Sequence, residues 1–423
     1  MSKRTVTLNY PSILWIVLLI ATSCKLVVYE PDVLSVTPCD IITFGACDNE
    51  PVALVVSTNV ETWSYTASDW VETRVSGDTL WVCATDNNSY SVARRGNIVF
   101  SAGYAPQVSV AISQSALQRP ERSIRQVVYL EVNDCNPLNI LEYNLVDGTP
   151  FFDAVILFAA NINYDREHDV VYLNNNSNVQ ALLDNSEIYL QPLRSRGIKV
   201  YLGLLGNHDE AGLAQLSAWG AKQWAVEVAE TCRLYSLDGV NLDDEYSKMP
   251  DIDNKWFAMP SAKAGARLAY ELKMALSDRC AWDTEVSIYE YGALYDIPSL
   301  TIDGITHTPS EFVDFIVADY GGKVYPYADF TYAHCSGASI QLNHGGELSQ
   351  RVAQTAVDKG YGWCMWFAFD PSGSGGTPSN REHSMAQFRV AADFFYNSEM
   401  AEPLHVYNKI GEGLYDPTPY SLY

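Results

Sequence analysis

The chain has 423 residues, a length that exceeds one ordinary domain and indicates two, one of them large. It carries 51 acidic against 27 basic residues, a net charge of −24, which argues against nucleic acid and anionic lipid as partners. A neutral ligand such as a sugar is compatible with this charge. The 27 Tyr and 10 Trp supply aromatic faces on which sugar rings stack, although core packing is the commoner use of any one of them.

Residues 1–24 have the pattern of an export signal. Lys3 and Arg4 precede an apolar run over 13–21, which is shorter than the about 20 residues needed to cross a bilayer. The segment resembles a bacterial lipoprotein signal with Cys24 as the lipidated residue, although Ala21 stands where such signals usually carry Leu. An ordinary cleaved signal peptide is the alternative. We expect an exported protein at the bacterial outer membrane or cell surface, with a lipid on Cys24 as its only membrane contact.

Eight cysteines follow Cys24 without any CxxC or Cys/His spacing of the kind that binds metal. We expect no metal and no cofactor, and buried thiols for most of the eight. Export would permit disulfides, but their pairing cannot be predicted from the spacing. These cysteines are Cys39, Cys47, Cys83, Cys135, Cys232, Cys280, Cys335 and Cys364.

Residues 25–118 are predicted to form a small all-β sandwich domain. Short β-rich runs such as VALVVSTN, TLWVCAT and GNIVFSA are separated by turn residues, and no helix-length periodic segment appears. The pattern resembles the BACON domain, an immunoglobulin-like module attached to many Bacteroidetes glycan-degrading proteins. Trp63, Trp70, Arg95 and Gln114 carry this resemblance, and the two Trp are expected to pack in the core. Residues 117–122 are polar and contain a proline, which is typical of a linker.

Residues 119–423 are predicted to form an α/β domain, a (β/α)₈ TIM barrel. Eight apolar runs of strand length alternate with longer segments of helical character such as 211–234 and 262–276. An open doubly wound sheet is the alternative, but no Gly-rich phosphate loop follows any of the runs. The runs are VVYLEV, AVILFAAN, KVYLGLLGN, GVNLD, VSIYEYG, FIVADYG, ASIQLNH and GWCMWFAF.

The stretch LDGVNLDDE, residues 237–245, combines apolar residues with acids and is the fourth predicted strand. Residues two apart share a face of a strand, so Asn241, Asp243 and Glu245 are expected to face the barrel interior, while Val240 and Leu242 pack on the helices. Glu245 then reaches the active-site face, and Asp243 lies about 6.6–7 Å below it in Cα spacing.

This stretch resembles the DxxDxDxE signature of glycoside hydrolase family 18, here Asp238, Asn241, Asp243 and Glu245. Within that family the surroundings resemble endo-β-N-acetylglucosaminidases, which cut the chitobiose core of N-linked glycans on glycoproteins. The resemblance covers residues 125 to about 395. It rests on EVNDCNPLN, ILFAANINYD, GLLGNHDEAG, DDEYSK and MWFAFD, in barrel order.

The resemblance implies a retaining hydrolysis without an enzyme nucleophile. Glu245 protonates the glycosidic oxygen and later deprotonates water. The 2-acetamido carbonyl of the substrate attacks the anomeric carbon and forms an oxazoline. Asp243 orients the acetamido N–H and stabilises the positive charge, and an ionised Asp243 is expected to keep Glu245 protonated.

Further site residues are expected at the strand ends. The family pattern implies that the Tyr320 hydroxyl binds the acetamido carbonyl and that Trp366 forms the apolar floor beneath the sugar. Simple packing or loop hydrogen bonding is the alternative at each of these positions. Asp238 and Asn241 from the signature, and Asn161, Asn163, Asn207, His208, Tyr289 and Tyr291 at other strand ends, are the remaining candidates for substrate binding.

Two positions depart from the family pattern. Asn241 replaces the second Asp of the signature and is expected to donate an N–H to Asp243, and Ala318 stands where relatives often carry an amide.

Two other functions stay open, a chitinase with a long cleft and a non-catalytic glycan-binding protein. Loss of the terminal acid would mark the latter, and Glu245 is present. We expect a monomer.

Overall fold

The structure is a computed structural model that describes residues 31–47, 49–85, 87, 93–116, 121–250 and 254–423. Contacts divide the described chain into two compact units, one that ends at 115 and one that continues to 423. The predicted signal and Cys24 lie outside the described residues. Among the described residues, no helix is both long enough and apolar enough to cross a membrane.

The N-terminal unit consists of two four-stranded sheets that share one apolar core, which includes Leu54, Val82 and Phe100. Its described residues form strands and no helix, as their composition predicts, while the likeness to a BACON domain stays a prediction. The first sheet has the order β1 (Leu34–Thr37), β3 (Val52–Thr58), β6 (Thr79–Ala84) and β5 (Val71–Ser76). The second has the order β2 (Ile42–Phe44), β8 (Val108–Gln114), β7 (Arg94–Ser101) and β4 (Ser64–Thr66).

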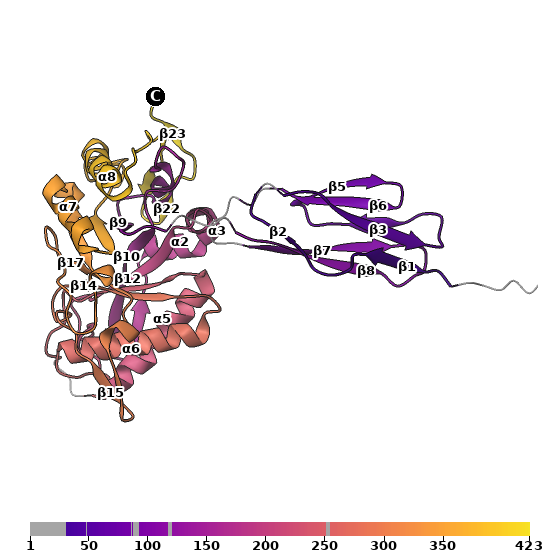
Figure 1. The fold of residues 1–423 in the computed structure, drawn as a ribbon. Coiled ribbons are helices and arrows are strands. Elements are labelled where there is room, and N and C mark those ends of the chain that lie inside the picture. The colour runs from indigo at the N-terminus through magenta and orange to yellow at the C-terminus, as the bar shows by residue number, and fades with distance from the viewer. Residues whose placement is uncertain (1–30, 48, 86, 88–92, 117–120, 251–253) are drawn as a thin grey trace, which may run out of the picture. The chain divides into compact units, whose positions relative to one another are not determined.

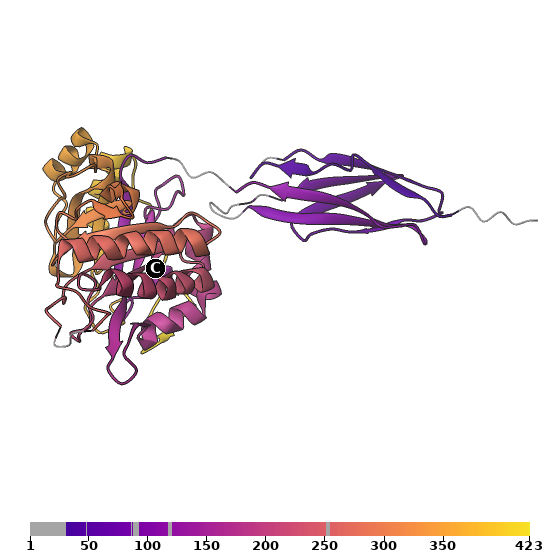
Figure 2. The same cartoon turned by 90° about the horizontal axis from the view of Figure 1, so that it is seen from below.

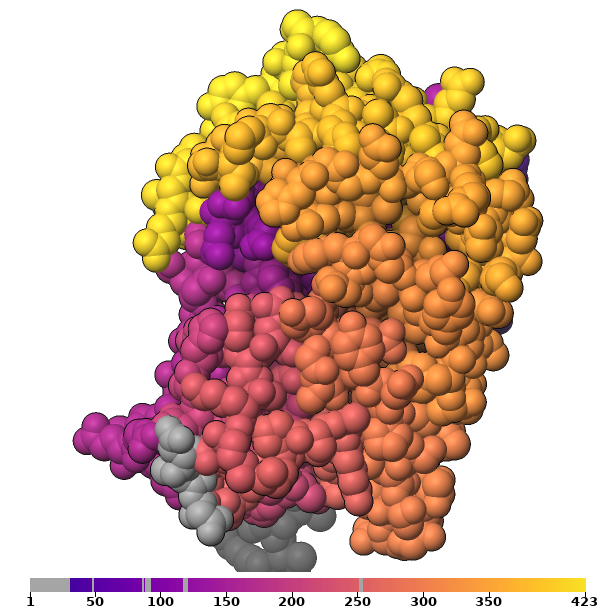
Figure 3. Space-filling view, turned by 90° about the vertical axis from the view of Figure 1, so that its left-hand side faces the viewer, coloured from indigo at the N-terminus to yellow at the C-terminus, as the bar shows by residue number. Residues whose placement is uncertain are grey.

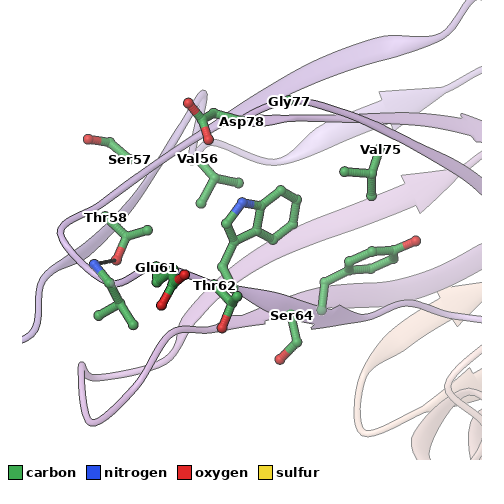
Figure 4. A pocket seen from close by; sticks show the side chains of 12 residues that line it. Val56, Ser57, Thr58, Glu61, Thr62, Ser64, Val75, Gly77 and Asp78 are labelled. Carbon is green, nitrogen blue, oxygen red and sulfur yellow. Dashed lines mark hydrogen bonds between the residues drawn. The ribbon is translucent and has the colours of Figure 1, made fainter.

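The two Trp predicted for this core are partly buried against it. The Trp63 ring lies 6.1 Å from the ring of Phe100. Trp63 also lines an open groove of about 740 Å³ together with Tyr65, Glu61 and Thr62 (Figure 4). One indole therefore serves both the core and the surface of this unit.

The second unit contains eight parallel strands that form the predicted barrel. Neighbouring strands pair in parallel register, and a parallel bridge between Ile316 and Cys335 joins the sixth strand to the start of the seventh. The strands in barrel order are β9 (Arg125–Glu131), β10 (Ala154–Asp165), β12 (Lys199–Leu205), β13 (Gly239–Asp243), β14 (Glu285–Glu290), β17 (Phe315–Ala318), β18 (Ser336–Gln341) and β19 (Trp363–Phe367).

Helices cover the outside of the barrel, with α5 and α6 side by side (Figures 1 and 2). Ser217 caps α5 by accepting a hydrogen bond from Gly220 N, and Ser261 caps α6 in the same way at Ala264 N, so both helices begin where the chain supplies an N-cap. The α-helices are α2 (Ser177–Asp184), α3 (Ser186–Tyr189), α4 (Gln191–Ser195), α5 (Ala218–Tyr235), α6 (Ala262–Arg279), α7 (Gln350–Lys359) and α8 (Arg381–Tyr396).

The alternation of strand and helix is incomplete in one part of the barrel. Between β14 and β18, residues 291–335, the described chain has no α-helix. This segment contains Pro298, Pro309, Pro326 and several glycines, which interrupt helices. It forms the hairpin β15 (Leu300–Ile302) and β16 (Ile305–His307) and the 3₁₀ turns η2 (Pro309–Glu311) and η3 (Tyr332–His334).

Smaller elements complete the unit. Strand β11 (Val170–Asn174) pairs antiparallel with β10, and η1 (Pro137–Glu142) and η4 (Leu342–His344) are 3₁₀ turns. Near the C-terminus, β20 (His405–Val406) pairs with β23 (Tyr420–Ser421), and β21 (Lys409–Gly411) pairs with β22 (Leu414–Tyr415).

The barrel has a core on each side of its wall, because side chains alternate along each strand. On β13, Val240 and Leu242 belong to the outer core against the helices, as predicted. Burial also confirms the prediction for most of the cysteines. Cys135, Cys232, Cys280, Cys335 and Cys364 are buried free thiols.

Candidate active site

The fourth barrel strand delivers the two predicted acids to the C-terminal end of the barrel. Asp243 is the last residue of β13, with only 3% of its surface exposed, and Glu245 follows two residues later as an exposed residue. Figure 3 looks onto one face of this unit, which is hollowed where purple residues from the beginning of the barrel meet orange residues from its second half. The burial of Asp243 agrees with the predicted alternation, and Glu245 lies just beyond the end of β13.

Asp243 is a buried acid among other acids. Burial, then the charges of Glu245, Asp244 and Asp319, raise its pKa well above the usual value for aspartate. Its Oδ1 atom has no hydrogen-bond partner among the described residues. These surroundings oppose the charge on Asp243, and the expectation of an ionised Asp243 stays a prediction. A positively polarised group that enters the site would favour ionisation.

Aromatic side chains at the ends of β14 and β19 and just after β17 cluster near this acid. The ring of Tyr320, which is 38% exposed, lies 6.0 Å from the ring of Tyr289 and 4.9 Å from the ring of Phe367. The Tyr289 hydroxyl donates to Asp319, which also accepts a hydrogen bond from Tyr320 N over 2.6 Å. Burial, then the charge of Asp243, raise the pKa of Tyr320, so its hydroxyl stays protonated and available as a donor. The predicted juxtaposition of Tyr320 and Asp243 is present.

Trp366 does not face the site, and this expectation is corrected. Its indole is fully buried, donates to Gln126 Oε1 over 2.9 Å and packs edge-on against Phe388 of α8. The alternation along β19 directs Trp366 outward, whereas Trp363, Met365 and Phe367 face the interior. Phe367, one residue later, is the aromatic residue of β19 that lies beside Tyr320.

Asp238 is also misassigned as a substrate-binding residue. It precedes β13, at the end of the strand opposite the acids. Its Oδ2 atom accepts hydrogen bonds from Val200 N over 2.8 Å and from Arg194 Nε over 3.3 Å. Catalytic residues of such barrels come from the C-terminal strand ends, and the other end serves stability. Asp238 therefore fixes the pairing of β12 and β13.

Asn241 lies inside the barrel, as expected, but has a different partner. Its Nδ2 donates to Ser287 Oγ on the neighbouring strand over 2.9 Å, and not to Asp243. The residue is fully buried one inward position below Asp243, so it does not contact a substrate directly. Any effect of Asn241 on the chemistry must pass through Asp243.

The other candidates lie at the C-terminal ends of β10, β12 and β14. Asn161 Nδ2 donates to Gly206 O, Asn163 Nδ2 donates to Asp209, and Asn207 Nδ2 donates to Asn163 Oδ1, with distances of 3.1–3.2 Å. These amides already join the loops of neighbouring strands. The His208 ring packs at a tilt against Tyr246 with 3.7 Å between ring centroids, and the ring of Tyr291 lies 5.9 Å from the ring of Tyr289. Their roles in substrate binding stay predictions.

Two residues of the site were not singled out from the sequence. Glu131 ends β9 and faces the interior, which the alternation with inward Val127 and Tyr129 indicates. Tyr246 follows Glu245, and burial together with the Glu245 carboxyl raises the pKa of its hydroxyl. Among the described residues, no group of three or more metal-binding side chains is present. The site thus offers an exposed acid beside a buried acid and phenol hydroxyls, which suits acid–base chemistry on a neutral polar substrate.

Comparisons with known proteins show which enzymes the chain resembles. No family model matches the chain. It is 39% identical to endo-β-N-acetylglucosaminidase F1 of Elizabethkingia meningoseptica over 303 residues, 71% of this chain and 82% of the relative. It is 46% identical to an endo-β-N-acetylglucosaminidase of Flavobacterium sp. (strain SK1022) over 122 residues, 29% of this chain and 38% of that protein.

Two crystal structures of Bacteroides thetaiotamicron EndoBT-3987 are also similar. The complex with a Man9GlcNAc2Asn substrate has a TM-score of 0.65 and 33% identity, and the match covers 92% of this chain and 99% of that one. The complex with a Man5GlcNAc product has the same score and identity and covers 90% and 97%. The protein is thus an enzyme, and it belongs to the endo-β-N-acetylglucosaminidases of glycoside hydrolase family 18.

Proposed function

We propose that the enzyme hydrolyses the β-1,4 bond between the two N-acetylglucosamine residues in the core of N-linked glycans on glycoproteins. The observation that carries the proposal is the pair Asp243 and Glu245 at the C-terminal end of β13, with Tyr320 beside Asp243. The substrate and product bound by EndoBT-3987 support the choice of bond, because the substrate has two N-acetylglucosamine units and the product has one.

The proposed reaction is assisted by the substrate. Glu245 donates a proton to the glycosidic oxygen, while the acetamido carbonyl of the sugar attacks the anomeric carbon. Asp243, as a carboxylate, accepts a hydrogen bond from the acetamido N–H and stabilises the positive charge that develops there. The Tyr320 hydroxyl donates to the acetamido oxygen. Water, deprotonated by Glu245, then opens the oxazoline with retention of configuration.

The mass of the peptide product tests the proposed function. Incubation with an N-glycosylated peptide should leave one N-acetylhexosamine on asparagine. Complete removal of the glycan with conversion of asparagine to aspartate would identify an amidase instead. Cleavage of chitin oligomers but not of the glycopeptide would identify a chitinase.

Substitution of Asn241 by aspartate is expected to move the acidic limb of the kcat/KM profile to higher pH. A second acid below Asp243 would raise the pKa of Asp243 further by like-charge repulsion, so Asp243 would ionise less readily. The measurement is kcat/KM on a glycopeptide from pH 4 to 8. Asn241→Ala is the control, because it removes the amide without adding charge and should leave the limb in place. An unchanged limb in Asn241→Asp would show that the two positions do not interact.

We further propose that the mature protein is exported and lipid-anchored at Cys24, with the N-terminal unit as a BACON-like spacer that holds the barrel away from the membrane. The pattern of residues 1–24 supports the anchor. Incorporation of a radiolabelled fatty acid into the wild-type chain, and its loss in Cys24→Ala, is the expected result. Equal labelling of both would contradict the assignment.

The N-terminal unit should be dispensable for the chemistry. The acids and aromatic residues of the site all belong to the second unit, and a domain of this size buries enough surface to fold alone. A chain that begins at Arg119 should keep kcat on a soluble glycopeptide within about threefold of a chain that begins at Lys25, a barrier difference below about 1 kcal/mol. A tenfold loss in a folded barrel would show that the first unit contributes to the site.

A further inference from the structure

Glu131 is an acid of the barrel mouth that the proposed mechanism does not use. It is the last residue of β9, two positions after the inward-facing Tyr129. Strands β10 and β12 separate β9 from β13, so Glu131 and Glu245 extend from different sides of the barrel wall. The two carboxyl groups are close enough for the charge of Glu245 to affect Glu131.

Among the described residues, Glu131 forms no ion pair with a basic side chain, whereas several other acids of this barrel do. No hydrogen bond to its carboxyl group occurs among the described residues. Four acids at or near the opposite ends of the strands each pair with a basic side chain. These pairs are Asp153 with Arg122, Asp238 with Arg194, Glu285 with Lys199, and Asp314 with Lys273.

The charged and titratable groups around Glu131 are mostly acids. Asp134 from the loop after β9 and Glu245 from the loop after β13 add negative charge, and Tyr320 follows β17. Lys409 is a cation near Asp134. Burial, then Asp134 and Glu245, raise the pKa of Glu131 to about 7. Keeping a half-buried carboxyl without a partner has a cost that a ligand can remove.

We infer that Glu131 is a further substrate-binding residue, whose carboxyl group forms hydrogen bonds with hydroxyl groups of the sugar that lies between it and Glu245. The inference rests on the proposed function and adds a contact on the side of the sugar away from β13. The neighbouring acid Asp243 is almost fully buried, and its Oδ1 atom has no hydrogen-bond partner among the described residues.

The contact makes substrate capture dependent on pH. Below pH about 7 Glu131 is protonated in the free enzyme, and its neutral carboxyl both donates to and accepts from hydroxyl groups. Above this pH it is ionised beside two other acids, and covering it with a sugar removes water from a charge. The kcat/KM value, which reports the free enzyme, should therefore fall as pH rises through about 7.

Two substitutions of Glu131 test the inference. Glu131→Gln keeps a neutral donor and acceptor, so kcat/KM at pH 6 should stay within about threefold of wild type, and the alkaline limb should move up by about one pH unit or more. Glu131→Ala loses the hydrogen bonds. In a Glu245→Gln background it should weaken binding of the glycopeptide about 10- to 100-fold by calorimetry, with an unchanged melting temperature.

Glu290→Gln is the matched control. Glu290 ends the neighbouring strand β14 and has its pKa raised to about 7, first by burial and then by Asp296. Glu290 lies two positions after the outward-facing Ile288 and therefore also faces outward. Its substitution should leave the alkaline limb of the kcat/KM profile in place. Unchanged binding when Glu131→Ala is added to Glu245→Gln would overturn the inference, as would an unmoved alkaline limb in Glu131→Gln or an equal movement in Glu290→Gln. A wild-type enzyme that does not cleave the glycopeptide would overturn the proposed function and this inference with it.

Discussion

Glu245→Gln should reduce hydrolysis of a glycopeptide by about 10² to 10⁴-fold while leaving the fold intact. The amide fills the same space at the exposed tip of β13 but cannot give a proton to the leaving oxygen. The expected result is a large loss of kcat with little change in KM, because the amide still permits binding. Single-turnover kinetics on one homogeneous glycopeptide would separate the loss of kcat from any change in KM.

Binding and stability complete the test of Glu245. The variant should bind the glycopeptide by calorimetry and melt within about 2 °C of wild type, since an exposed side chain contributes little to folding. A Glu245→Gln protein that keeps a third of wild-type activity would show that another residue supplies the proton.

Asp243→Asn should also reduce hydrolysis by about 10²-fold or more, for a different reason. The amide cannot ionise, so it leaves the positive charge on the acetamido group without a counter-charge. A preformed oxazoline bypasses the step that Asp243 most assists. Transfer from an oxazoline donor to an acceptor should therefore survive in Asp243→Asn better than hydrolysis of the intact glycan does.

Asp244→Asn is the matched control for this substitution. Asp244 is the adjacent buried acid but points to the other side of the strand, where its Oδ2 accepts a hydrogen bond from Ala293 N over 3.0 Å. The substitution removes one charge beside Asp243, but an amide oxygen can accept the same bond, so the loss of hydrolysis should be at least about tenfold smaller than in Asp243→Asn. If Asp243→Asn lost hydrolysis and transfer equally, the selective role of Asp243 would be contradicted.

The barrel was predictable because of how its strands are buried. Strands covered on both faces appear as nearly continuous apolar runs, and all eight runs form barrel strands. The missing helices between β14 and β18 were less evident. Prolines and glycines in residues 291–335 interrupt helices, but the pattern of the whole segment still predicts a complete (β/α)₈ barrel.

The site was predictable where alternation along a strand was applied, and not where it was neglected. Counting from Asn241 places Asp243 and Glu245 correctly. The same counting on β19 would have selected Phe367 instead of Trp366, and on β9 it would have found Glu131.

Other features depend on tertiary contacts that no local pattern contains. The raised pKa of Asp243 arises from burial and from Asp319 as well as from its sequence neighbours, and Asp319 follows another strand, β17. The partner of Asn241 is Ser287, 46 residues away. These relations follow from the register of β13, β14 and β17, which the sequence pattern leaves undetermined.

The central claim is that the acetamido group of the substrate, and not a carboxylate of the enzyme, attacks the anomeric carbon. The most direct test compares kcat/KM for two glycopeptides that differ only in this group, acetamido or trifluoroacetamido, on the sugar at the cleaved bond. Fluorine withdraws electrons from the attacking carbonyl, so the rate should fall by about 100-fold or more, a barrier increase of at least ~2.7 kcal/mol. Equal rates within about threefold would contradict the account and identify an enzyme carboxylate, Asp243 first, as the nucleophile.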